Sequence, residues 1–412
     1  MTVKTHCRIC GEPLPDPFLD LGRMPLANAF LRLPAEFPGE ERYPLAVCLC
    51  QRCGLVQLTV TVPPEQLYRA YPYVSSTSAA VRRYAGELAG QVIEKLGLGS
   101  SHQVVELGSN DGLVLRAFQE RGVRVLGVEP ARNVAAVARE NGVHTVEEFF
   151  GEETGQRLAR DFGPASVILG RHVFAHIDDL HDFFRGVDRL LTPKGVLLIE
   201  VPYLGNLYRE IEFDTIYHEH LSYIALRPVE VLAQAHGFQL WDVERVPLHG
   251  GSILLWMVRG QAPGHPSDRL RALRSEEERL RLDRAETWAE FSRRLARWKE
   301  HFEKGVDSLS RAGARWAGYG AAAKANTLLN FCPSVAERLT AVLDRNPWKH
   351  GTYTPGTHLP VVSADRWEAN GTTHLLILAW NFKEEIIAQM EPFARAGGRF
   401  FVPIPRPELV ER

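Results

Sequence analysis

Four cysteines in two pairs constrain the first part of the chain more than any other feature. The pairs occupy residues 7–10 and 50–53, and a glycine follows each of them. Two cysteines separated by two residues occupy one edge of a tetrahedral metal site, and the glycine lets the backbone turn beneath the metal. The spacing predicts a closed, structural zinc site with four ligands, Cys7, Cys10, Cys50 and Cys53. Spacing alone favours Cys50 over Cys48; disulfide pairing, or two unrelated pairs, are the alternatives.

Composition excludes several classes of partner. The chain has 412 residues, of which 45% are hydrophobic, and a formal net charge of -2. Such a chain builds two or three ordinary cores and has no basic surplus for nucleic acid or an anionic membrane. The first residues are polar, and the longest apolar runs, such as Val196–Ile199, are strand-sized and too short to span a bilayer. We expect a cytoplasmic protein that binds neither nucleic acid nor membrane, with a monomer as the default.

Short apolar runs alternate with helical patterns from about residue 75 to 258, and again from 314 to 403. This alternation predicts an α/β fold with parallel, doubly wound sheets of the Rossmann type. Dense charge of both signs over residues 267–310 predicts a pair of solvated, amphipathic helices. The expected organisation is a zinc-binding domain at 1–68, a central domain at 69–260, a helical connector at 261–310 and a C-terminal domain at 311–412.

The segment 106–112, with the sequence E-L-G-S-N-D-G, joins a predicted strand to a predicted helix. Small residues there let a ligand approach the free amides of the helix N-terminus. Glu129 ends the next strand, where a carboxylate accepts hydrogen bonds from the ribose of an adenosine. A dinucleotide prefers glycine where Asn110 stands, and the acidic Asp111 suits a cationic ligand better than a pyrophosphate. The pattern resembles motif I of class I methyltransferases and favours S-adenosylmethionine; a glycine-rich turn without a ligand is the alternative.

Two stretches rich in histidine follow, at residues 171–179 and 213–223. The second holds tyrosine, histidine and carboxylate groups at a density that can supply a base, an acid and an oxyanion donor. If it is extended, His218 and His220 share one face, but the sequence does not fix this geometry. A hydrogen-bonded polar turn is one alternative, and a catalytic metal held by these two residues and His176 is another.

A second glycine-rich turn lies near the C-terminus. Gly318, Gly320 and Ala323 match G-x-G-x-x-A between a strand and a helix, with Lys324 in the first helical turn and Asp344 after the next strand. Alone, this is a dinucleotide fingerprint and favours an NAD(P)-dependent oxidoreductase. A helix N-terminus with a nearby lysine equally suits the diphosphate of a sugar nucleotide. A Rossmann-like domain without a ligand is the third interpretation.

Taken in order, these segments resemble the sugar C-methyltransferases that act on nucleotide-linked 4-keto-deoxyhexoses in deoxysugar biosynthesis. The marks are the two cysteine pairs, Y-P-Y-V-S-S at 71–76, the 106–112 turn, A-H-I at 175–177, Y-H-E-H-L-S-Y at 217–223, G-Y-G-A at 318–321 with Lys324, Asn326 and Thr327, and D-R-N-P at 344–347. The resemblance covers nearly the whole chain. It implies a zinc-binding N-terminal domain, a class I methyltransferase domain, and a C-terminal Rossmann-like domain that helps to hold the nucleotide sugar. His172 departs from the family pattern, where a smaller amide residue is expected.

The resemblance also implies a reaction and a set of site residues. A base removes a proton from a carbon next to the 4-keto group of a dTDP-linked sugar, with carbon 3 favoured over carbon 5, and the enolate is methylated. His220 is the implied base, and the groups that orient it or bind the enolate oxygen are Tyr217, Glu219, His176 and Tyr71. The implied cofactor residues are Glu106, Gly108, Ser109, Asn110, Asp111, Gly112, Glu129, Pro130 and His172, and the implied substrate residues are Tyr319, Gly320, Lys324, Asn326 and Asp344.

Three rival functions remain open at this stage. The first is the nicotinamide-dependent oxidoreductase, with its cofactor at residues 318–323 and Asp344 on the ribose. The second is a non-enzymatic adaptor that carries zinc and two degenerate Rossmann domains. The third is an O- or N-methyltransferase, for which a cluster that stabilises an enolate would be surplus.

Overall fold

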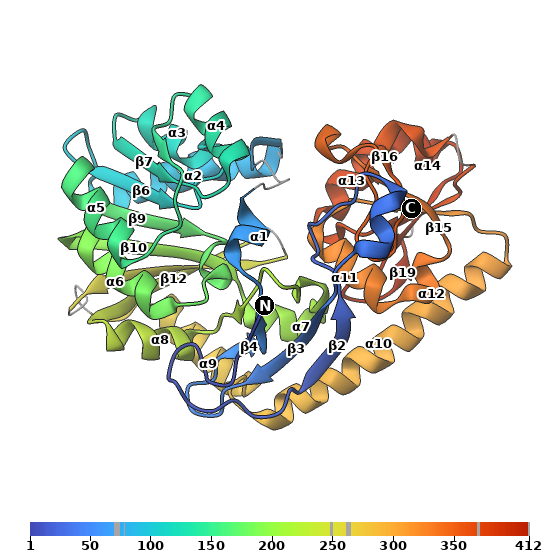
Figure 1. Cartoon of the computed structure of the whole chain (residues 1–412), viewed down its shortest axis with the longest axis horizontal. Coiled ribbons are helices and arrows are strands. Elements are labelled where there is room, and N and C mark those ends of the chain that lie inside the picture. The colour runs from blue at the N-terminus through green and yellow to red at the C-terminus, as the bar shows by residue number, and fades with distance from the viewer. Residues whose placement is uncertain (70–74, 78, 248–249, 261–264, 369–370, 411–412) are drawn as a thin grey trace.

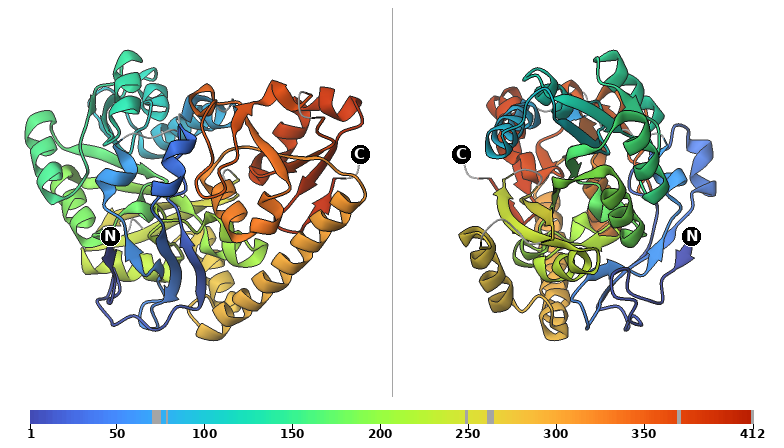
Figure 2. Two further views of the ribbon diagram at one scale, coloured as in Figure 1. Left: turned by 45° about the vertical axis from the view of Figure 1, so that its right-hand side comes forward. Right: turned by 90° about the vertical axis from the view of Figure 1, so that its left-hand side faces the viewer.

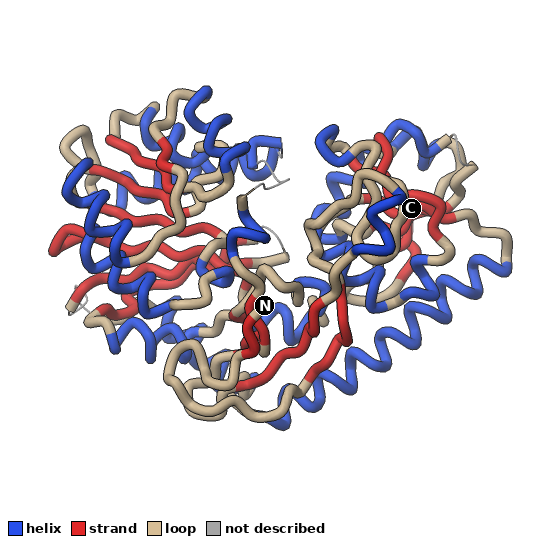
Figure 3. The backbone as a smooth tube through the Cα atoms, in the orientation of Figure 1, coloured by secondary structure: helices blue, strands red, loops and turns tan. Residues whose placement is uncertain are grey.

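Two lobes, each built on its own sheet, face each other across the N-terminal segment (Figure 1). The computed structural model describes residues 1–412 except 70–74, 78, 248–249, 261–264, 369–370 and 411–412. Strands form a separate layer in each lobe, with helices on the outside (Figure 3). The residues between the lobes therefore come from distant parts of the sequence.

The N-terminal segment forms a four-stranded antiparallel sheet in the order β11-β4-β3-β2. Its strands are β2 (Leu19–Met24), β3 (Tyr43–Leu49), β4 (Val56–Leu58) and β11 (Ser222–Tyr223). A two-stranded pair, β1 (Thr2–Val3) with β5 (Val60–Thr61), and the short helix α1 (Pro64–Tyr68) complete it. Strand β11 belongs to the central part of the sequence, so the N-terminal sheet is closed by the last two residues of the second histidine-rich stretch.

The central lobe contains a seven-stranded sheet in the order β12-β13-β10-β9-β6-β7-β8. The strands are β6 (Gln103–Leu107), β7 (Arg124–Val128), β8 (Thr145–Val146), β9 (Ala165–Arg171), β10 (Leu191–Pro202), β12 (Phe238–Val246) and β13 (Ser252–Arg259). The first five are parallel, and β13 and β12 are antiparallel. The predicted α/β fold with a doubly wound sheet is confirmed, with an antiparallel pair at one edge that the sequence did not indicate.

Helices cover both faces of this sheet. One apolar cluster contains α2 (Ala79–Leu96) and α3 (Leu113–Gln119), and a second contains α5 (Glu152–Phe162), α6 (Leu180–Leu190) and α8 (Leu226–Ala235). Helix α4 (Arg132–Glu140) lies beside β8. Because the strands are buried on both sides, they read as continuous apolar runs in the sequence.

The C-terminal lobe contains a six-stranded sheet in the order β16-β15-β14-β17-β18-β19, parallel except for β19. Its strands are β14 (Trp316–Tyr319), β15 (Leu339–Asp344), β16 (Val361–Ser363), β17 (His374–Ile377), β18 (Arg399–Val402) and β19 (Glu408–Leu409). Its helices are α11 (Ala323–Phe331), α12 (Pro333–Ala336), α13 (Lys383–Gln389) and α14 (Glu391–Arg395). The second Rossmann-like unit that the sequence predicts is therefore present.

The expected pair of charged helices forms as α9 (Asp268–Leu280) and α10 (Ala285–Arg311). One side of α10 is buried rather than solvated, through Trp288, Phe291, Leu295, Trp298 and Phe302. These side chains belong to one apolar cluster that also contains strands of the N-terminal and C-terminal sheets. Helix α10 runs from the base of the molecule along the C-terminal lobe (Figure 2), so it packs these two parts together. No helix within the described ranges has the length and apolarity that a membrane crossing requires.

Candidate active site and zinc centre

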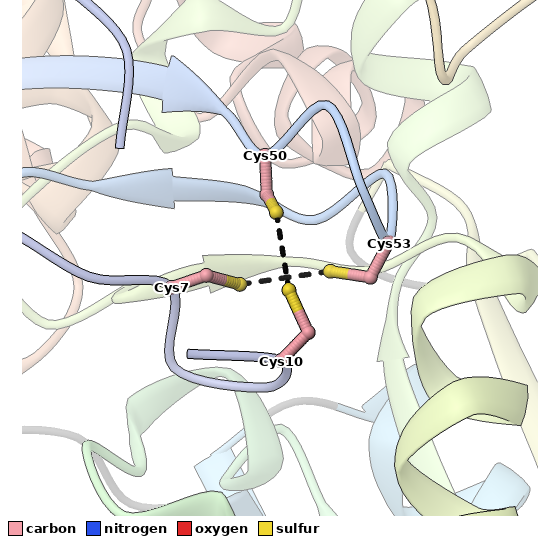
Figure 4. A group of neighbouring side chains, drawn as sticks. All are labelled: Cys7, Cys10, Cys50 and Cys53. Carbon is pink, nitrogen blue, oxygen red and sulfur yellow. Dashed lines mark hydrogen bonds between the residues drawn. The ribbon is translucent and has the colours of Figure 1, made fainter. Parts of the chain in front are cut away.

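The four cysteines of the two pairs meet at one point. Their sulfur atoms lie within 4.8 Å of one another and point toward a common centre (Figure 4). Cys7 Sγ is 3.5 Å from Cys53 Sγ, and Cys10 Sγ is 3.4 Å from Cys50 Sγ. These separations exceed a disulfide bond of about 2.05 Å and approach the ~3.8 Å edge of a tetrahedron with zinc–sulfur bonds of ~2.3 Å. Four cysteine sulfurs in this arrangement fit zinc, and their separations exclude disulfide bonds between them.

The glycine after each pair allows the turn. Gly11 and Gly54 have φ of 68° and 81°, in the left-handed region that favours glycine. Their amides donate to the carbonyl of the first cysteine of each pair, at 3.1 and 2.8 Å. Cys48 lies instead within β3, with its Sγ 3.6 Å from the Gln57 carbonyl oxygen. The structure thus places Cys50, and not Cys48, in the cluster.

A cavity of about 590 Å³ opens between the two lobes and the N-terminal segment. Asn28 and part of residues 61–68 line it from the N-terminal side, the ends of β6, β7 and β9 from the central lobe, and residues 322–324 from the C-terminal lobe. The predicted site residues that line it are Glu106, Gly108, Ser109, Asn110, Glu129, Pro130, His172, His176, Tyr217, His220 and Lys324. Residues that were predicted to act in catalysis, to bind the cofactor and to bind the substrate therefore share one cavity.

The turn after β6 forms a backbone cradle at one end of this cavity. Gly108 has φ of 64°, and a Cβ atom there would lie 2.1 Å from Val173 Cγ1, so a side chain would collide. Glu129 accepts hydrogen bonds from the amides of Asn110 and Ala131, at 2.9 and 2.8 Å. Burial raises the pKa of Glu129. A glycine cradle beside a carboxylate at the end of the second strand fits the adenosine of S-adenosylmethionine.

Two of the predicted cofactor residues accept hydrogen bonds from the backbone of a neighbouring segment, residues 75–76. Asn110 Oδ1 accepts from the Ser75 amide at 2.9 Å, and Asp111 Oδ2 accepts from the Ser76 amide at 3.0 Å. Asp111 is 1% exposed, and it lies behind the described cavity lining together with Gly112. Asp111 therefore orders the segment that precedes α2 rather than facing the cavity.

Buried carboxylates stand beneath the cradle. Glu200, in β10, accepts from Tyr84 Oη and Arg171 Nε at 2.9 Å and lies 3.0 Å from His172 Nε2. Burial alone would raise the pKa of Glu200, but Arg171 and His172 hold it below its usual range. Burial raises the pKa of Glu106 to about 8. His172, the residue that departs from the family pattern, thus lies between Glu200 and the cavity.

His220 lies at the centre of the cavity lining and is held in one tautomer. Its Nδ1 is 2.8 Å from the Thr215 carbonyl oxygen, which can only accept, so Nδ1 carries the hydrogen. Its Nε2 is 2.8 Å from Tyr217 Oη. Burial lowers the pKa of His220 to about 3 and raises that of Tyr217 well above its usual value. The imidazole is therefore neutral at pH 7, and its Nε2 lone pair accepts the Tyr217 hydroxyl.

A second histidine faces His220. The ring of His176 lies 5.1 Å from that of His220 and stacks on Tyr68 at 5.4 Å. Glu219 is 2% exposed; its side chain accepts from Asn28 Nδ2 at 2.7 Å, and its carbonyl oxygen from Tyr68 Oη at 3.1 Å. Glu219 thus fixes the N-terminal segment against the histidine-rich stretch. The predicted Tyr71 lies outside the described residues.

His218 points away from this site, which settles two open alternatives. Residues 217–220 form a turn, closed by the His220 amide and the Tyr217 carbonyl oxygen at 2.9 Å, so the extended pairing of His218 with His220 does not form. His218 is 1% exposed, and its Nε2 is 3.1 Å from the Pro44 carbonyl oxygen. Within the described part of the chain, the four cysteines are the group that can hold a metal ion. The three-histidine metal site is therefore wrong.

Two lysines of the C-terminal lobe face the cavity. Lys324 lies in the first turn of α11, and Lys349 is 8% exposed, with its Nζ 2.6 Å from the Ala321 carbonyl oxygen. Burial lowers the pKa of Lys349, and the charge of Asp344 opposes this. The helix hydrogen bonds of α11 begin at the Asn326 amide, so the amides of residues 323–325 are free at the same end. Both lysines and these amides suit an anion.

The other predicted substrate residues support this end without lining it. Asp344 accepts from the amides of residues 321 and 346, at 2.7 Å each. Asn326 is 1% exposed and donates to the Ala27 carbonyl oxygen at 2.6 Å. Tyr319 is 4% exposed, and a Cβ atom on Gly320 would lie 2.6 Å from that of Ala379. Asn326 therefore fixes the N-terminal segment to the C-terminal lobe.

Comparison with known proteins decides the family. Residues 7–68 match a family model described as a zinc binding domain, residues 81–243 a methyltransferase domain, and residues 247–405 a C-methyltransferase C-terminal domain. C-methyltransferase NovU of Streptomyces niveus is 36% identical over 408 residues, which make up 98% of this chain and 96% of NovU. The chain belongs to the C-methyltransferase family.

This C-methyltransferase uses S-adenosylmethionine as its methyl donor and carries zinc at the four-cysteine cluster. Magnesium protoporphyrin IX methyltransferase of Synechocystis PCC 6803 is 11% identical with a TM-score of 0.34, covering 43% of this chain and 79% of that one. The PH0226 protein of Pyrococcus horikoshii OT3 is 17% identical with a TM-score of 0.38, covering 47% and 98%. Membership of the family decides against the oxidoreductase and the adaptor.

Four residues that shape the C-methyltransferase site were not predicted as site residues from the sequence. They are Asn28, Tyr68, Thr215 and Lys349. Asn28 and Tyr68 precede the first expected α/β unit, and Lys349 lies two residues after the D-R-N-P segment, outside every quoted motif. Thr215 acts through its backbone carbonyl, which residue identity does not encode. Proximity to the Y-H-E-H run was the one available signal, and it applied to Thr215 alone.

Proposed function

We propose that this C-methyltransferase acts on a nucleotide-linked 4-keto-deoxyhexose in deoxysugar biosynthesis. The enzyme removes a proton from a carbon next to the ketone, with carbon 3 favoured, and transfers the methyl group to the resulting enolate. One observation carries the proposal: a single cavity joins an acidic end, a neutral histidine and a basic end. The sugar is expected to be linked to dTDP.

The acidic end suits the cationic methyl donor. Seven carboxyl groups line the cavity, at residues 65, 106, 129, 148, 178, 179 and 182, and none of them comes from the C-terminal lobe. Glu106 is mostly protonated at pH 7, because burial raises its pKa to about 8, and Asp178 pairs with Lys4 and Arg8. S-adenosylmethionine supplies a methyl group on a positively charged sulfur, whose charge is stabilised near carboxylates. Glu129 is placed to accept hydrogen bonds from the ribose, while Gly108 and Ser109 leave room for the rest of the cofactor.

The basic end suits the diphosphate of the nucleotide. Lys324, Lys349 and the free amides of α11 lie together on the C-terminal lobe. A helix N-terminus favours an anion, and lysines add charge-assisted hydrogen bonds. A sugar attached to this diphosphate would extend toward the middle of the cavity, where Tyr217 and His220 line the wall.

The middle of the cavity suits proton abstraction from a carbon acid. The Thr215 carbonyl oxygen fixes the hydrogen of His220 on Nδ1, which leaves the Nε2 lone pair free to act as the base once Tyr217 moves its hydrogen bond to the ligand. Tyr217 stays protonated because its pKa is raised, so it can donate to the developing enolate oxygen. His176 faces the same space and is neutral, because burial lowers its pKa.

Replacing Glu129 by Gln is expected to weaken binding of S-adenosylmethionine by about 10- to 100-fold, because hydrogen bonds to a charged group contribute about 1.5–3 kcal/mol. Titration calorimetry with S-adenosylhomocysteine measures the change. Glu147→Gln is the control, since that exposed carboxylate pairs with Arg139 at the surface. Equal affinities in the two variants would contradict the assignment of Glu129 to the ribose.

Replacing Lys349 or Lys324 by Met is expected to raise the dissociation constant for dTDP about tenfold each, because one charge-assisted contact is lost. Binding of S-adenosylhomocysteine should stay unchanged in both variants, since the lysines lie at the opposite end of the cavity. Lys304→Met, on the exposed side of α10, is the control. Unchanged dTDP affinity in both variants would place the nucleotide elsewhere.

The proposed function is tested by incubating the enzyme with dTDP-4-keto-6-deoxyglucose and S-adenosylmethionine that carries a labelled methyl group. We expect label in the nucleotide sugar, and NMR of the product locates it on carbon 3 or carbon 5. Label on oxygen or nitrogen would contradict carbon methylation. If the sugar stays unlabelled with every 4-keto nucleotide sugar tried, while S-adenosylhomocysteine binds normally, the substrate class is wrong.

A further inference from the structure

A tryptophan of the C-terminal lobe reaches into the central lobe beside the base. Trp380 begins the short helix η7 (Trp380–Phe382), which follows β17. It is 8% exposed, and its indole Nε1 donates to Asp214 Oδ2 at 2.7 Å. The neighbouring residues 379, 381 and 382 line the cavity, while Trp380 lies behind them. It therefore joins the two lobes without facing the ligands.

Asp214 transmits this contact to the histidine. It lies in the helix η4 (Phe213–Thr215) and is fully buried. The next residue is Thr215, whose carbonyl oxygen is 2.8 Å from His220 Nδ1. Oδ1 of Asp214 has no hydrogen-bond partner among the described residues, and the indole is the side-chain donor to Oδ2. The Lys324 charge and the local backbone also stabilise this carboxylate. A buried carboxylate depends strongly on such a donor, because an acceptor left without its partner costs the full desolvation penalty of that group. We expect η4 to relax when this donor is removed.

From this arrangement we infer that Trp380 is a positioning residue for His220, acting through Asp214 and the Thr215 carbonyl. The C-terminal lobe thereby helps to fix the tautomer of the base in the central lobe. The inference rests on the proposed function only in taking His220 as the base. It assigns to Trp380 a role that none of the sequence motifs indicates.

The same tryptophan also contacts the proposed nucleotide site. The Lys324 ammonium lies 4.5 Å from the centre of the Trp380 ring, within the range of a cation–π contact. Helix α11, which carries Lys324, packs against η4. An anion held by Lys324 would therefore lie one side chain away from the Trp380–Asp214 contact. The residues that hold the nucleotide and those that orient the base share this tryptophan.

The test compares Trp380→Phe with a matched tryptophan. Phenylalanine keeps an aromatic ring and removes the N–H donor. Trp316→Phe is the control, because the Trp316 indole is buried in the same lobe and donates to Ser310 Oγ at 3.0 Å. Trp316 begins β14, whereas the cavity lies at the carboxyl ends of the strands of this sheet. The readout is the nitrogen NMR spectrum of the histidines, with the His220 signal assigned from its loss in His220→Gln.

We expect wild-type His220 to carry its hydrogen on Nδ1 alone, and Trp380→Phe to show a mixture of both tautomers. Trp316→Phe should match the wild type. A single Nδ1 tautomer in Trp380→Phe would overturn the inference, whatever happens to turnover. If Trp380→Phe does not fold, Asp214→Asn and Asp214→Ala replace it, because Asn keeps an acceptor for the indole and Ala does not. The mixture of His220 tautomers must then appear in Asp214→Ala and not in Asp214→Asn.

Proton exchange measures the consequence for the base. With dTDP-4-keto-6-deoxyglucose, S-adenosylhomocysteine and D2O, deuterium should enter the sugar next to the ketone without methyl transfer. We expect Trp380→Phe to slow this exchange about 10- to 100-fold, since a small misplacement of a catalytic group costs up to about 10²-fold. No exchange with wild-type enzyme would count against the proposed substrate, while the tautomer result would still decide the role of Trp380.

Discussion

Replacing His220 by Gln is expected to abolish methyl transfer while leaving the affinity for S-adenosylmethionine within a few fold. A positioned general base contributes about 10²–10⁴-fold to a rate. Glutamine keeps a polar group of similar reach, but its amide has no lone pair basic enough to take a proton from carbon. Single-turnover assays with labelled methyl donor, together with calorimetry with S-adenosylhomocysteine, measure the two effects separately.

His218→Gln is the matched control for this experiment. His218 is two residues away in the same turn and is more deeply buried, but its ring points to the Pro44 carbonyl oxygen and away from the cavity. We expect this variant to lose some stability and to keep its turnover per folded enzyme. Normal turnover in His220→Gln, or an equal loss in the two variants, would show that another group is the base.

Replacing Cys50 by Ser is expected to unfold the N-terminal segment and, with it, the active site. Structural zinc contributes about 10–16 kcal/mol of binding free energy at pH 7 in small domains, and a serine hydroxyl is a poor substitute for a thiolate. We expect loss of one zinc ion per chain, a large fall in the melting temperature and no turnover. Metal analysis and thermal unfolding measure the first two effects.

Cys48→Ala is the control, because Cys48 is a fully buried cysteine of the neighbouring strand that lies outside the cluster. This variant should keep its zinc and lose only the modest stability of one buried sulfur. A strong chelator should reproduce the Cys50→Ser result in the wild-type enzyme. A folded, active Cys50→Ser enzyme without metal would contradict a structural zinc.

The sequence predicted the parts of this molecule that local patterns determine. The cysteine spacing, the Gly108 turn and the strand–helix alternation each reflect short-range geometry, and all reappear in the structure. The two-residue strand β11 escaped prediction because it forms only by pairing with β4. The burial of one side of α10 was not predicted, because the many charged residues of this helix suggested a solvated surface. Its apolar side packs on strands that are distant in sequence.

Side-chain direction limited the prediction of the site. The Y-H-E-H run marked the right segment, but of its four residues Tyr217 and His220 line the cavity. His218 turns away to the Pro44 carbonyl oxygen, and Glu219 accepts from Asn28 instead. Asn326 and Asp111 matched ligand-binding patterns, yet both are 1% exposed and hold backbone groups. Such outcomes depend on which segments meet in space, and a single sequence does not state this.

The closing of the N-terminal sheet by β11 has a consequence for how such enzymes can be recombined. Strand β11 begins two residues after His220 and pairs with β4. The zinc-binding segment and the segment that carries His220 therefore contribute strands to the same sheet. A chimera that exchanges only residues 1–68 with those of a relative would pair a foreign β4 with the native β11. We expect activity to survive such an exchange only when the segment from η4 through β11 is transplanted with it. The part of the chain that must be exchanged as a whole therefore consists of two segments that are separate in sequence.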